Sequence, residues 1–297
     1  MFVDQELHRK RWVIAMRPRT LSSAVCPVIM ASVMAADAGV FHFAAVLAAL
    51  TGALLIQIGT NFANDYSDGL KGTDANRLGP MRAVASGLIQ PQTMKGAIIV
   101  TFFLVLIPGT YIAYRGGPVY LLIGVVSILS GILYTAGPKP IGYVGLGDLF
   151  VLAFFGPIAL GGTYYLHTQE LPINVIIAGF APGLFSVAVL TVNNLRDIDG
   201  DREAGKKTLA VRFGPTFAKF EYLIVLVVAS LAIPGHIVYH GDGHAYSLAG
   251  GFALLVAIPG IVTVFNYEDP RELNKAFAHT GRAFIVFTVL FCVGWMM

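Results

Sequence analysis

The chain has 297 residues, of which 56% are hydrophobic and only 12% are charged, and its mean hydropathy is +0.71. Because soluble globular domains carry about 25% charged residues, this composition excludes an ordinary soluble domain and indicates a membrane protein. The net charge of +3 says little by itself. The two cysteines lie in apolar segments, which indicates buried thiols rather than a disulfide framework.

Segments without a charged side chain follow one another along the chain. A helix that crosses a bilayer needs roughly 17 to 25 mostly apolar residues, and continuous apolar segments favour helices over a barrel. We therefore predict an all-α polytopic membrane protein with about nine transmembrane helices. The segments are 20–36, 38–64, 96–114, 116–138, 149–169, 171–195, 222–241, 243–267 and, shortened by Arg282, 283–297.

The basic residues fall on one side of these predicted helices. If the N-terminus is cytoplasmic, all of the 20 Lys and Arg residues except Arg115 lie in the N-terminal tail or in the loops after the second, fourth, sixth and eighth helices. Cytoplasmic loops of membrane proteins carry an excess of Lys and Arg. The distribution therefore predicts a cytoplasmic N-terminus and a C-terminus on the opposite side.

Two of the predicted cytoplasmic helix ends are acidic. The second helix runs into "NDYSDGLKGTD" (64–74), and the sixth runs into "NNLRDIDGDREAGKKT" (193–208). Within or just before each passage, three polar residues spaced by three or four positions share one face of the helix. These residues are Asn61, Asp65 and Asp68 for the first passage, and Asn193, Asp197 and Asp201 for the second.

The same two passages suggest an internal repeat. Four helices separate them, an even number, so both halves of the chain would cross the membrane in the same direction. We predict a single domain, 1–297, with parallel four-helix halves at roughly 15–137 and 146–267 and a last helix at roughly 276–297. The acidic passages would then meet at the mouth of a central cavity that opens to the cytoplasm.

The residue types in these passages indicate a chemistry. Like charges on one helix face are destabilising unless they are neutralised, and ionisable residues near hydrocarbon are candidates for function. Carboxylate and amide oxygens suit Mg²⁺, which is commonly shared with substrate phosphates. Acids with nearby cations predict a site for a metal-bridged diphosphate, although pairing of these charges in solvated loops is an alternative. The candidate diphosphate-binding residues are Lys71, Arg77, Arg82, Lys139, Arg196, Lys206 and Lys207.

Five blocks of the sequence resemble, in the same order, those of the UbiA superfamily of intramembrane prenyltransferases. Within it they are most similar to the branch that prenylates 1,4-dihydroxy-2-naphthoate in menaquinone biosynthesis. The resemblance covers nearly the whole chain. The blocks are "MRPRTL" (16–21), "NFANDYSDGLKGTD" (61–74), "LGPMRAV" (78–84), "YTAGPKPIGYVGLGD" (134–148) and "NNLRDIDGDREAGKKTL" (193–209).

The resemblance implies a Mg²⁺-dependent enzyme. Its substrates would be a polyprenyl diphosphate and dihydroxynaphthoate, and prenylation with loss of CO₂ would give a demethylmenaquinol. The metal ligands that it implies are Asn61, Asp65, Asp68, Asn193, Asp197 and Asp201. The catalytic residues that it implies are Asp65, Asp68, Asp197, Asp201 and Tyr134. Arg17 and Asn64 would bind the acceptor.

Further residues fit this chemistry. Aromatic faces stabilise cations, so the allylic cation left by the diphosphate needs aromatic walls near the helix ends. Glycine-rich patches at 154–162 and 180–186 would let helices approach closely. The candidate aromatic residues are Tyr66, Tyr134, Phe150, Phe154 and Phe155.

Other functions remain open from the sequence. Within the superfamily, 4-hydroxybenzoate or homogentisate could replace the naphthoate. A membrane transporter is the alternative from another class, although transporter sites lie near the midplane and these polar residues lie at one face. A CDP-alcohol phosphotransferase is disfavoured because "DGLKGTD" lacks the Ala-Arg pair of its DG-x-x-AR signature. We expect contact with membrane lipid and no nucleic-acid partner.

Overall fold

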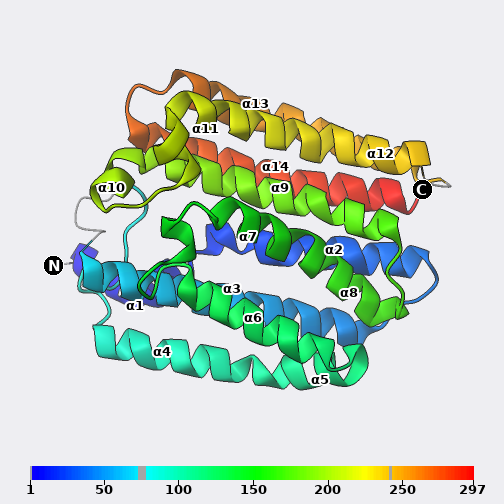
Figure 1. The fold of residues 1–297 in the computed structure, drawn as a ribbon, viewed down its shortest axis with the longest axis horizontal. Helices are drawn as coiled ribbons and strands as arrows, with labels where there is room; N and C mark the ends of the chain where they lie inside the picture. Colours follow the sequence, from blue (N-terminus) through cyan, green and yellow to red (C-terminus); the bar gives the residue numbers. More distant parts are fainter. Residues whose placement is uncertain (1, 73–77, 241–242) are drawn as a thin grey trace.

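The computed structural model describes residues 2–72, 78–240 and 243–297, and every regular element in them is helical. Most of the helices run lengthwise and are joined at two ends (Figure 1). The longer elements are α1 (Phe2–Met16), α2 (Ser22–Asp37), α3 (Phe43–Lys71), α4 (Pro91–Leu104), α5 (Leu106–Gly116), α6 (Val119–Leu133), α7 (Gly147–Ala153), α8 (Ala159–Thr168), α9 (Ile173–Arg196), α10 (Ile198–Glu203), α11 (Leu209–Val227), α12 (Ile233–His240), α13 (Ala253–Asn266) and α14 (Leu273–Trp295).

Short helical segments connect or interrupt these helices. Two of them, η3 and η4, are π-helical turns that lie inside longer helices, while the others are 3₁₀ turns. They are η1 (Pro18–Thr20), η2 (Ile141–Tyr143), η3 (Phe154–Ile158), η4 (Val228–Ala232), η5 (Ala245–Phe252) and η6 (Pro270–Glu272).

The helices confirm an all-α integral membrane protein. Within the described residues, seven are long and apolar enough to cross a bilayer: Phe43–Lys71, Pro91–Gly116, Gly147–Thr168, Ile173–Arg196, Leu209–His240, Ala245–Asn266 and Pro270–Trp295. The segments Gln5–Thr20 and Ser22–Asp37 meet at 53° and together make an eighth candidate. Because α6 is apolar but shorter, the count of nine stays a prediction.

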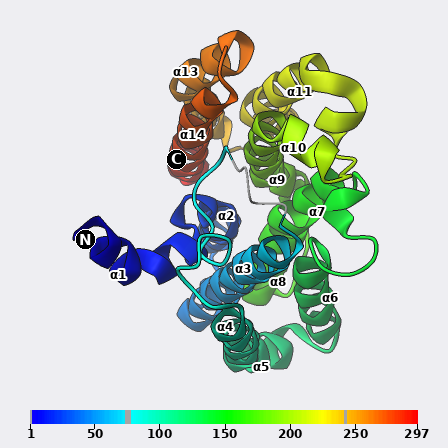
Figure 2. The same ribbon diagram turned by 90° about the vertical axis from the view of Figure 1, so that its left-hand side faces the viewer.

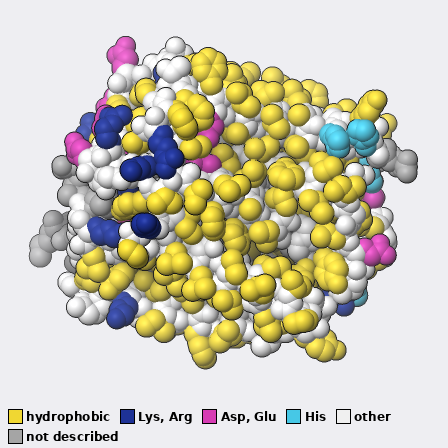
Figure 3. Space-filling model, viewed as in Figure 1, with side chains coloured by type: hydrophobic (Ala, Val, Ile, Leu, Met, Phe, Trp, Pro, Cys, Tyr) yellow, Lys and Arg dark blue, Asp and Glu magenta, His cyan; other side chains and the backbone are white. Residues whose placement is uncertain are grey.

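Both acidic passages lie at one end of the molecule. The C-terminal ends of α3 and α9 lie on the same side of the molecule as α10 and the N-terminus of the chain (Figure 1). The C-terminus of the chain lies on the opposite side (Figure 1). Seen from the end with the acidic passages, α3 to α6 lie on one side and α9 to α14 on the other, with α2, α7 and α8 between (Figure 2). Hydrophobic side chains cover most of the face in Figure 3, and Lys and Arg gather near the acidic end.

Three glycines bring two helices into backbone contact. A Cβ atom on Gly156 would lie 2.7 Å from the Gly179 carbonyl oxygen, and one on Gly183 would lie 2.6 Å from the Leu152 carbonyl oxygen. The crossing coincides with the π-helical turn η3, which contains Pro157. Small residues allow membrane helices to approach this closely, as the glycine-rich patches predicted. The contact fixes the wall formed by α7, η3 and α9.

We expect Gly183→Ala to destabilise the fold, because the added methyl group would collide with a backbone carbonyl that cannot move independently. Overpacking of this kind costs about 1–3 kcal/mol. Thermal unfolding of the purified protein in detergent measures the effect. Gly96→Ala in α4 is the matched control, since nothing lies within 4 Å of its Cβ position. Equal unfolding temperatures for the two variants would contradict the tight crossing.

Candidate functional site

A cavity of about 550 Å³ lies between α2, α3, α6 and the α7–α9 wall. At the acidic end its lining is polar. Toward the other end the lining is apolar and includes Val28, Ala49 and Leu166. The polar lining comes from both acidic passages and the loops beside them: Asn61, Asn64, Asp68, Arg82, Asn193, Asn194, Asp197, Asp201 and Lys206.

On the α3 side, Asp68 is the carboxylate that faces the cavity. Its side chain is buried, with Oδ2 lying 3.5 Å from Arg82 Nη2, and Arg82 is itself buried. The hydroxyl of Tyr143 donates to Asp68 Oδ1 at 3.4 Å. Asn64, one turn earlier on α3, accepts a hydrogen bond from the Thr135 hydroxyl at 2.8 Å. Asp68 of the first passage is therefore in contact with Arg82, one of the predicted diphosphate-binding bases.

On the α9 side, the two predicted metal-ligand aspartates also have basic neighbours. Asp201 Oδ1 lies 2.9 Å from Lys206 Nζ. Asp197 accepts two hydrogen bonds from Arg196, at 2.8 Å from Nε and 2.7 Å from Nη2. Asp199, whose role the sequence did not reveal, points outward and pairs with an exposed base of the same helix. Asp199 differs from Asp197 and Asp201, which line the cavity, only in the side of the backbone from which its side chain projects.

The two passages meet at Lys206. Burial disfavours its charged form, but the carboxylates of Asp201 and Asp68 outweigh burial and raise the pKa of Lys206 above its ordinary value. Its ammonium group lies 5.1 Å from the centre of the Tyr143 ring, and Lys71 lies 4.7 Å from the same ring centre. Acids from positions far apart in the sequence therefore share one electrostatic environment.

The side chain of Asp65 contacts a loop, whereas that of Asp68 lines the cavity. The Asp65 side chain is buried, and its carboxylate oxygens accept hydrogen bonds from the backbone N–H groups of Ala83 and Val84 at 2.9 and 3.0 Å. Of the described residues, those that line the cavity do not include Asp65. In this structure its contact fixes the loop that carries Arg82.

Arg196 is also turned away from the cavity. Its side chain is 1% exposed, and besides Asp197 it binds Asn274 Oδ1 at 3.0 Å through Nη1. A Cβ atom on Gly79 would lie 2.6 Å from Arg196 Nη2. These contacts join α9 to α14 and to the loop that follows α3. Of the described residues, those that line the cavity do not include Arg196, and its role toward a diphosphate stays a prediction.

The remaining predicted bases are Lys71, Lys139, Lys207 and Arg77. Lys71 Nζ donates to the carbonyl oxygen of Thr135 at 2.6 Å. Lys139 and Lys207 have exposed side chains, and the backbone N–H of Lys207 donates to the carbonyl oxygen of Tyr143 at 2.8 Å. Arg77 lies outside the described residues.

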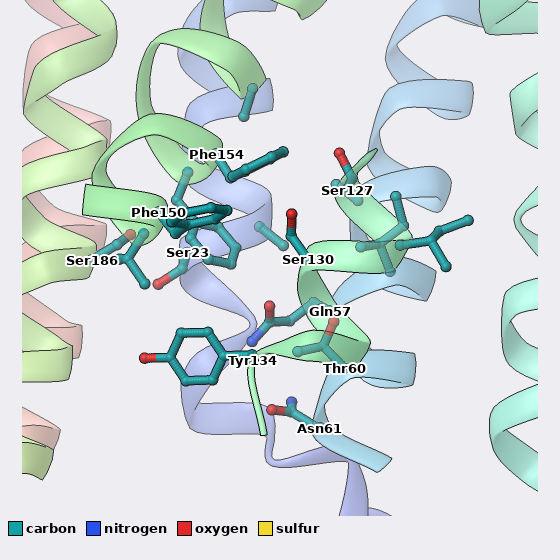
Figure 4. A pocket seen from close by; sticks show the side chains of 18 of the residues that line it. Ser23, Gln57, Thr60, Asn61, Ser127, Ser130, Tyr134, Phe150, Phe154 and Ser186 are labelled. Carbon is teal, nitrogen blue, oxygen red and sulfur yellow. The ribbon is translucent and has the colours of Figure 1, made fainter. Parts of the chain in front are cut away.

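The expected aromatic wall is largely present. Phe150, Phe154, Phe155 and Tyr134 line the cavity, and the first two rings stack with centroids 6.0 Å apart. Figure 4 shows Phe150 and Phe154 deeper than Tyr134. Tyr66 instead packs in the apolar cluster around Phe62, as part of the protein core.

Several lining residues were missed from the sequence. Tyr143 lies inside the block at 134–148, but nothing in its spacing marked it as a partner of an acid. Small hydroxyl and amide side chains along apolar helices gave no signal, because isolated polar residues in such helices commonly bond to their own backbone. Those labelled in Figure 4 are Ser23, Gln57, Thr60, Ser127, Ser130 and Ser186.

The UbiA prenyltransferase family model matches residues 24–293. The chain belongs to the UbiA prenyltransferase family. It is 35% identical to 1,4-dihydroxy-2-naphthoate octaprenyltransferase of Escherichia coli, over 98% of this chain and 97% of that protein. It is 36% identical to the protein of the same name from Mycobacterium tuberculosis, over 94% of each. The expected family and its prenyltransferase activity are thereby confirmed.

Solved structures agree on the fold of this family member. A UbiA homologue from Aeropyrum pernix superposes with a TM-score of 0.68 at 15% identity, covering 91% of this chain and 97% of the homologue. A UbiA homologue from Archaeoglobus fulgidus bound to GPP and Mg²⁺ gives the same TM-score and identity, covering 97% of this chain and 100% of the homologue. The likeness shows a common helical architecture.

The donor set of this UbiA family member suits a hard cation that is shared with phosphate. In the part of the chain that the structure describes, no three His, Cys, Asp or Glu side chains are grouped to hold a metal ion by themselves. Carboxylates and amide oxygens do line one mouth, and Mg²⁺ is usually held by one or two carboxylates together with waters and substrate phosphates. The residues present therefore fit Mg²⁺ with a diphosphate rather than an all-protein metal cage.

We expect the stabilisation from Lys206 to persist into alkaline solution. Because its pKa is raised in the folded protein, this contribution is complete below the ordinary lysine value of about 10.4 and is lost only as the pH rises through the higher folded value. Chemical unfolding of the wild-type protein and Lys206→Met across the alkaline range is the measurement. The difference in unfolding free energy should stay constant up to about pH 10. A difference that shrinks near neutral pH would contradict the pairing with Asp201 and Asp68.

Proposed function

We propose that this UbiA family member transfers a polyprenyl group from polyprenyl diphosphate to 1,4-dihydroxy-2-naphthoate and releases CO₂ and diphosphate. The main support is the cavity itself, which has a charged mouth built from both acidic passages and an apolar interior. An amphiphile with a diphosphate head and a hydrocarbon tail has the complementary shape and polarity. The names of the two curated relatives support the naphthoate as acceptor.

The diphosphate would bind at the mouth. Asp68, Asp197 and Asp201, with the amide oxygens of Asn61 and Asn193, are the side chains that would hold Mg²⁺ against it. When bound, the metal acts as a Lewis acid that stabilises negative charge on the leaving diphosphate. Asp65 was predicted in the same set. Its bonds to the loop backbone support a role in positioning Arg82 instead.

The bases at the mouth would take the remaining phosphate charge. Arg82 and Lys206 line the cavity and lie beside carboxylates of opposite passages. Lys71 lies at the rim, beside Tyr143. Charge-assisted hydrogen bonds from such groups to phosphate oxygens are short and strong, and cations fixed before the reaction stabilise the charge that develops on the diphosphate.

Prenyl transfer would then proceed inside the mouth. The C–O bond of the allylic diphosphate breaks and its electron pair leaves with the diphosphate. The rings of Tyr134, Phe150 and Phe154 line the cavity (Figure 4), and they would stabilise an allylic cation formed there. The ring carbon that carries the carboxylate attacks C1 of the prenyl group, and loss of CO₂ returns the electron pair to the ring, so no proton needs to be removed from that carbon.

Charged residues support an orientation for the acceptor in the cavity and an orientation for the protein in the membrane. Arg17 lines the cavity at the junction of α1 and α2, where it could meet the naphthoate carboxylate, and Asn64 lines the mouth nearby. Basic residues gather at the acidic end (Figure 3), so this end faces the cytoplasm by the positive-inside rule. The C-terminus is then on the opposite side.

We expect Asp201→Asn and Asp68→Asn to reduce prenyl transfer by at least about 100-fold, because loss of a charged ligand in a water-poor site costs several kcal/mol. The measurement is turnover by detergent-purified protein supplied with Mg²⁺. The matched control is Asp199→Asn in the same passage, whose exposed ion pair should matter little. Full activity of the Asp201 or Asp68 variant would refute the proposed metal site.

We expect the purified protein to prefer dihydroxynaphthoate when 4-hydroxybenzoate and homogentisate are offered side by side with the same polyprenyl diphosphate. Product analysis by mass distinguishes the three acceptors. Turnover should stop when Mg²⁺ is removed by a chelator and return when it is restored. Preference for another acceptor would keep the prenyl-transfer chemistry and overturn the naphthoate assignment.

A further inference from the structure

The joint between α1 and α2 fixes the orientation of two amide side chains on α3. The Thr20 hydroxyl donates its proton to the carbonyl oxygen of Arg17 at 3.0 Å. Because this proton is used, the Thr20 oxygen can only accept hydrogen bonds from the side-chain amides of Gln57, at 3.3 Å, and Asn61, at 3.1 Å. Both amides must present their NH₂ groups to Thr20. Asn61 confirms this, because the same nitrogen also donates to the Met16 carbonyl oxygen at 2.9 Å.

The amide oxygens are consequently turned away from Thr20. Gln57 and Asn61 both line the cavity, and four residues on a helix correspond to a rise of about 6 Å. Asn61 lies at the level of the predicted metal site. Gln57 lies one turn deeper, between Tyr134 and Thr60 on the mouth side and Phe150 on the interior side (Figure 4).

This position is where the acceptor ring must lie. The reacting carbon of the prenyl group is attached to the diphosphate, so the aromatic ring has to reach a point just inside the charged mouth. An amide oxygen with no proton can accept a hydrogen bond but cannot donate one. It therefore suits a phenolic O–H group and disfavours a carboxylate or a phosphate.

We propose that Gln57 Oε1 binds one phenolic hydroxyl of the acceptor, with Thr20 holding the amide in the required orientation. The assignment rests on the proposed function, in which the acceptor is a dihydroxy aromatic acid. A phenol that donates a hydrogen bond gains electron density on its ring, which favours attack on the allylic cation. Gln57 is thus a substrate-binding residue and Thr20 is a positioning residue.

The test combines a residue change with removal of a substrate hydroxyl. We expect Gln57→Met to weaken binding of 1,4-dihydroxy-2-naphthoate by about 10-fold, a typical effect of one hydrogen bond. Two analogues, 1-hydroxy-2-naphthoate and 4-hydroxy-2-naphthoate, each lack one hydroxyl and serve as competitive ligands. The variant should bind one of them as well as the wild-type protein does, because that analogue lacks the hydroxyl that meets Gln57. The KM for polyprenyl diphosphate should change by less than about 2-fold.

Thr20 provides a second, independent readout. Thr20→Val should reduce discrimination between the dihydroxy acid and the same analogue, because the amide of Gln57 is released. Thr20→Ser keeps the hydroxyl and should restore discrimination. Thr51→Val is the control. Thr51 lies on α3, the helix that carries Gln57, but it is exposed and is absent from the described cavity lining.

The outcomes separate the two proposals. Equal weakening of all three ligands by Gln57→Met would indicate a structural defect and overturn the assignment, as would unchanged binding of the dihydroxy acid. If either of these results is found while the wild-type protein prenylates dihydroxynaphthoate, the proposed function stands and only the assignment of Gln57 fails. If the wild-type protein neither binds nor prenylates dihydroxynaphthoate, both proposals fail.

Discussion

Neutralisation of carboxylates beside hydrocarbon is the constraint on which the site depends. A buried charge is costly unless it is paired and hydrogen-bonded. Asp68, Asp197 and Asp201 each have a basic partner, and two of these partners come from loops that follow the acidic helices. The pairs made by Arg82 and Lys206 therefore hold these loops at the cavity. They also place the side chains of Arg82 and Lys206 at the mouth of the cavity.

Neighbouring residues of the long helix α3 make different contacts. Residues 57, 61, 64 and 68 line the cavity, while Asp65 holds the loop backbone at residues 83 and 84. Asn61 does both, since its nitrogen binds the α1–α2 joint and its oxygen is turned away from that joint. Residues that line the cavity and a residue that supports the loop thus follow one another along α3. The geometry of the mouth therefore depends on contacts outside it.

The architecture of this fold is compatible with very different sequences. Solved homologues share the architecture at 15% identity, because apolar helices with small residues at their crossings can be built from many sequences. The backbone contact at Gly156, Gly179 and Gly183 shows what such a crossing requires. The mouth instead is lined by oxygen and nitrogen groups of defined charge, such as Asp68, Asp201 and Lys206.

The sequence by itself determined the helical membrane class, the family, and the presence of acids from both passages at one end. Each of these follows from local composition or from helical spacing. The tertiary structure decided which acid faces the cavity. Asp65 and Asp68 lie about 60° apart around the helix axis, so the two share a broad face. The loop at residues 83 and 84 covers Asp65 and leaves Asp68 at the cavity. The buried position of Arg196 likewise depends on Asn274, which is distant in sequence. Such partners cannot be read from spacing, because they are set by how whole helices pack.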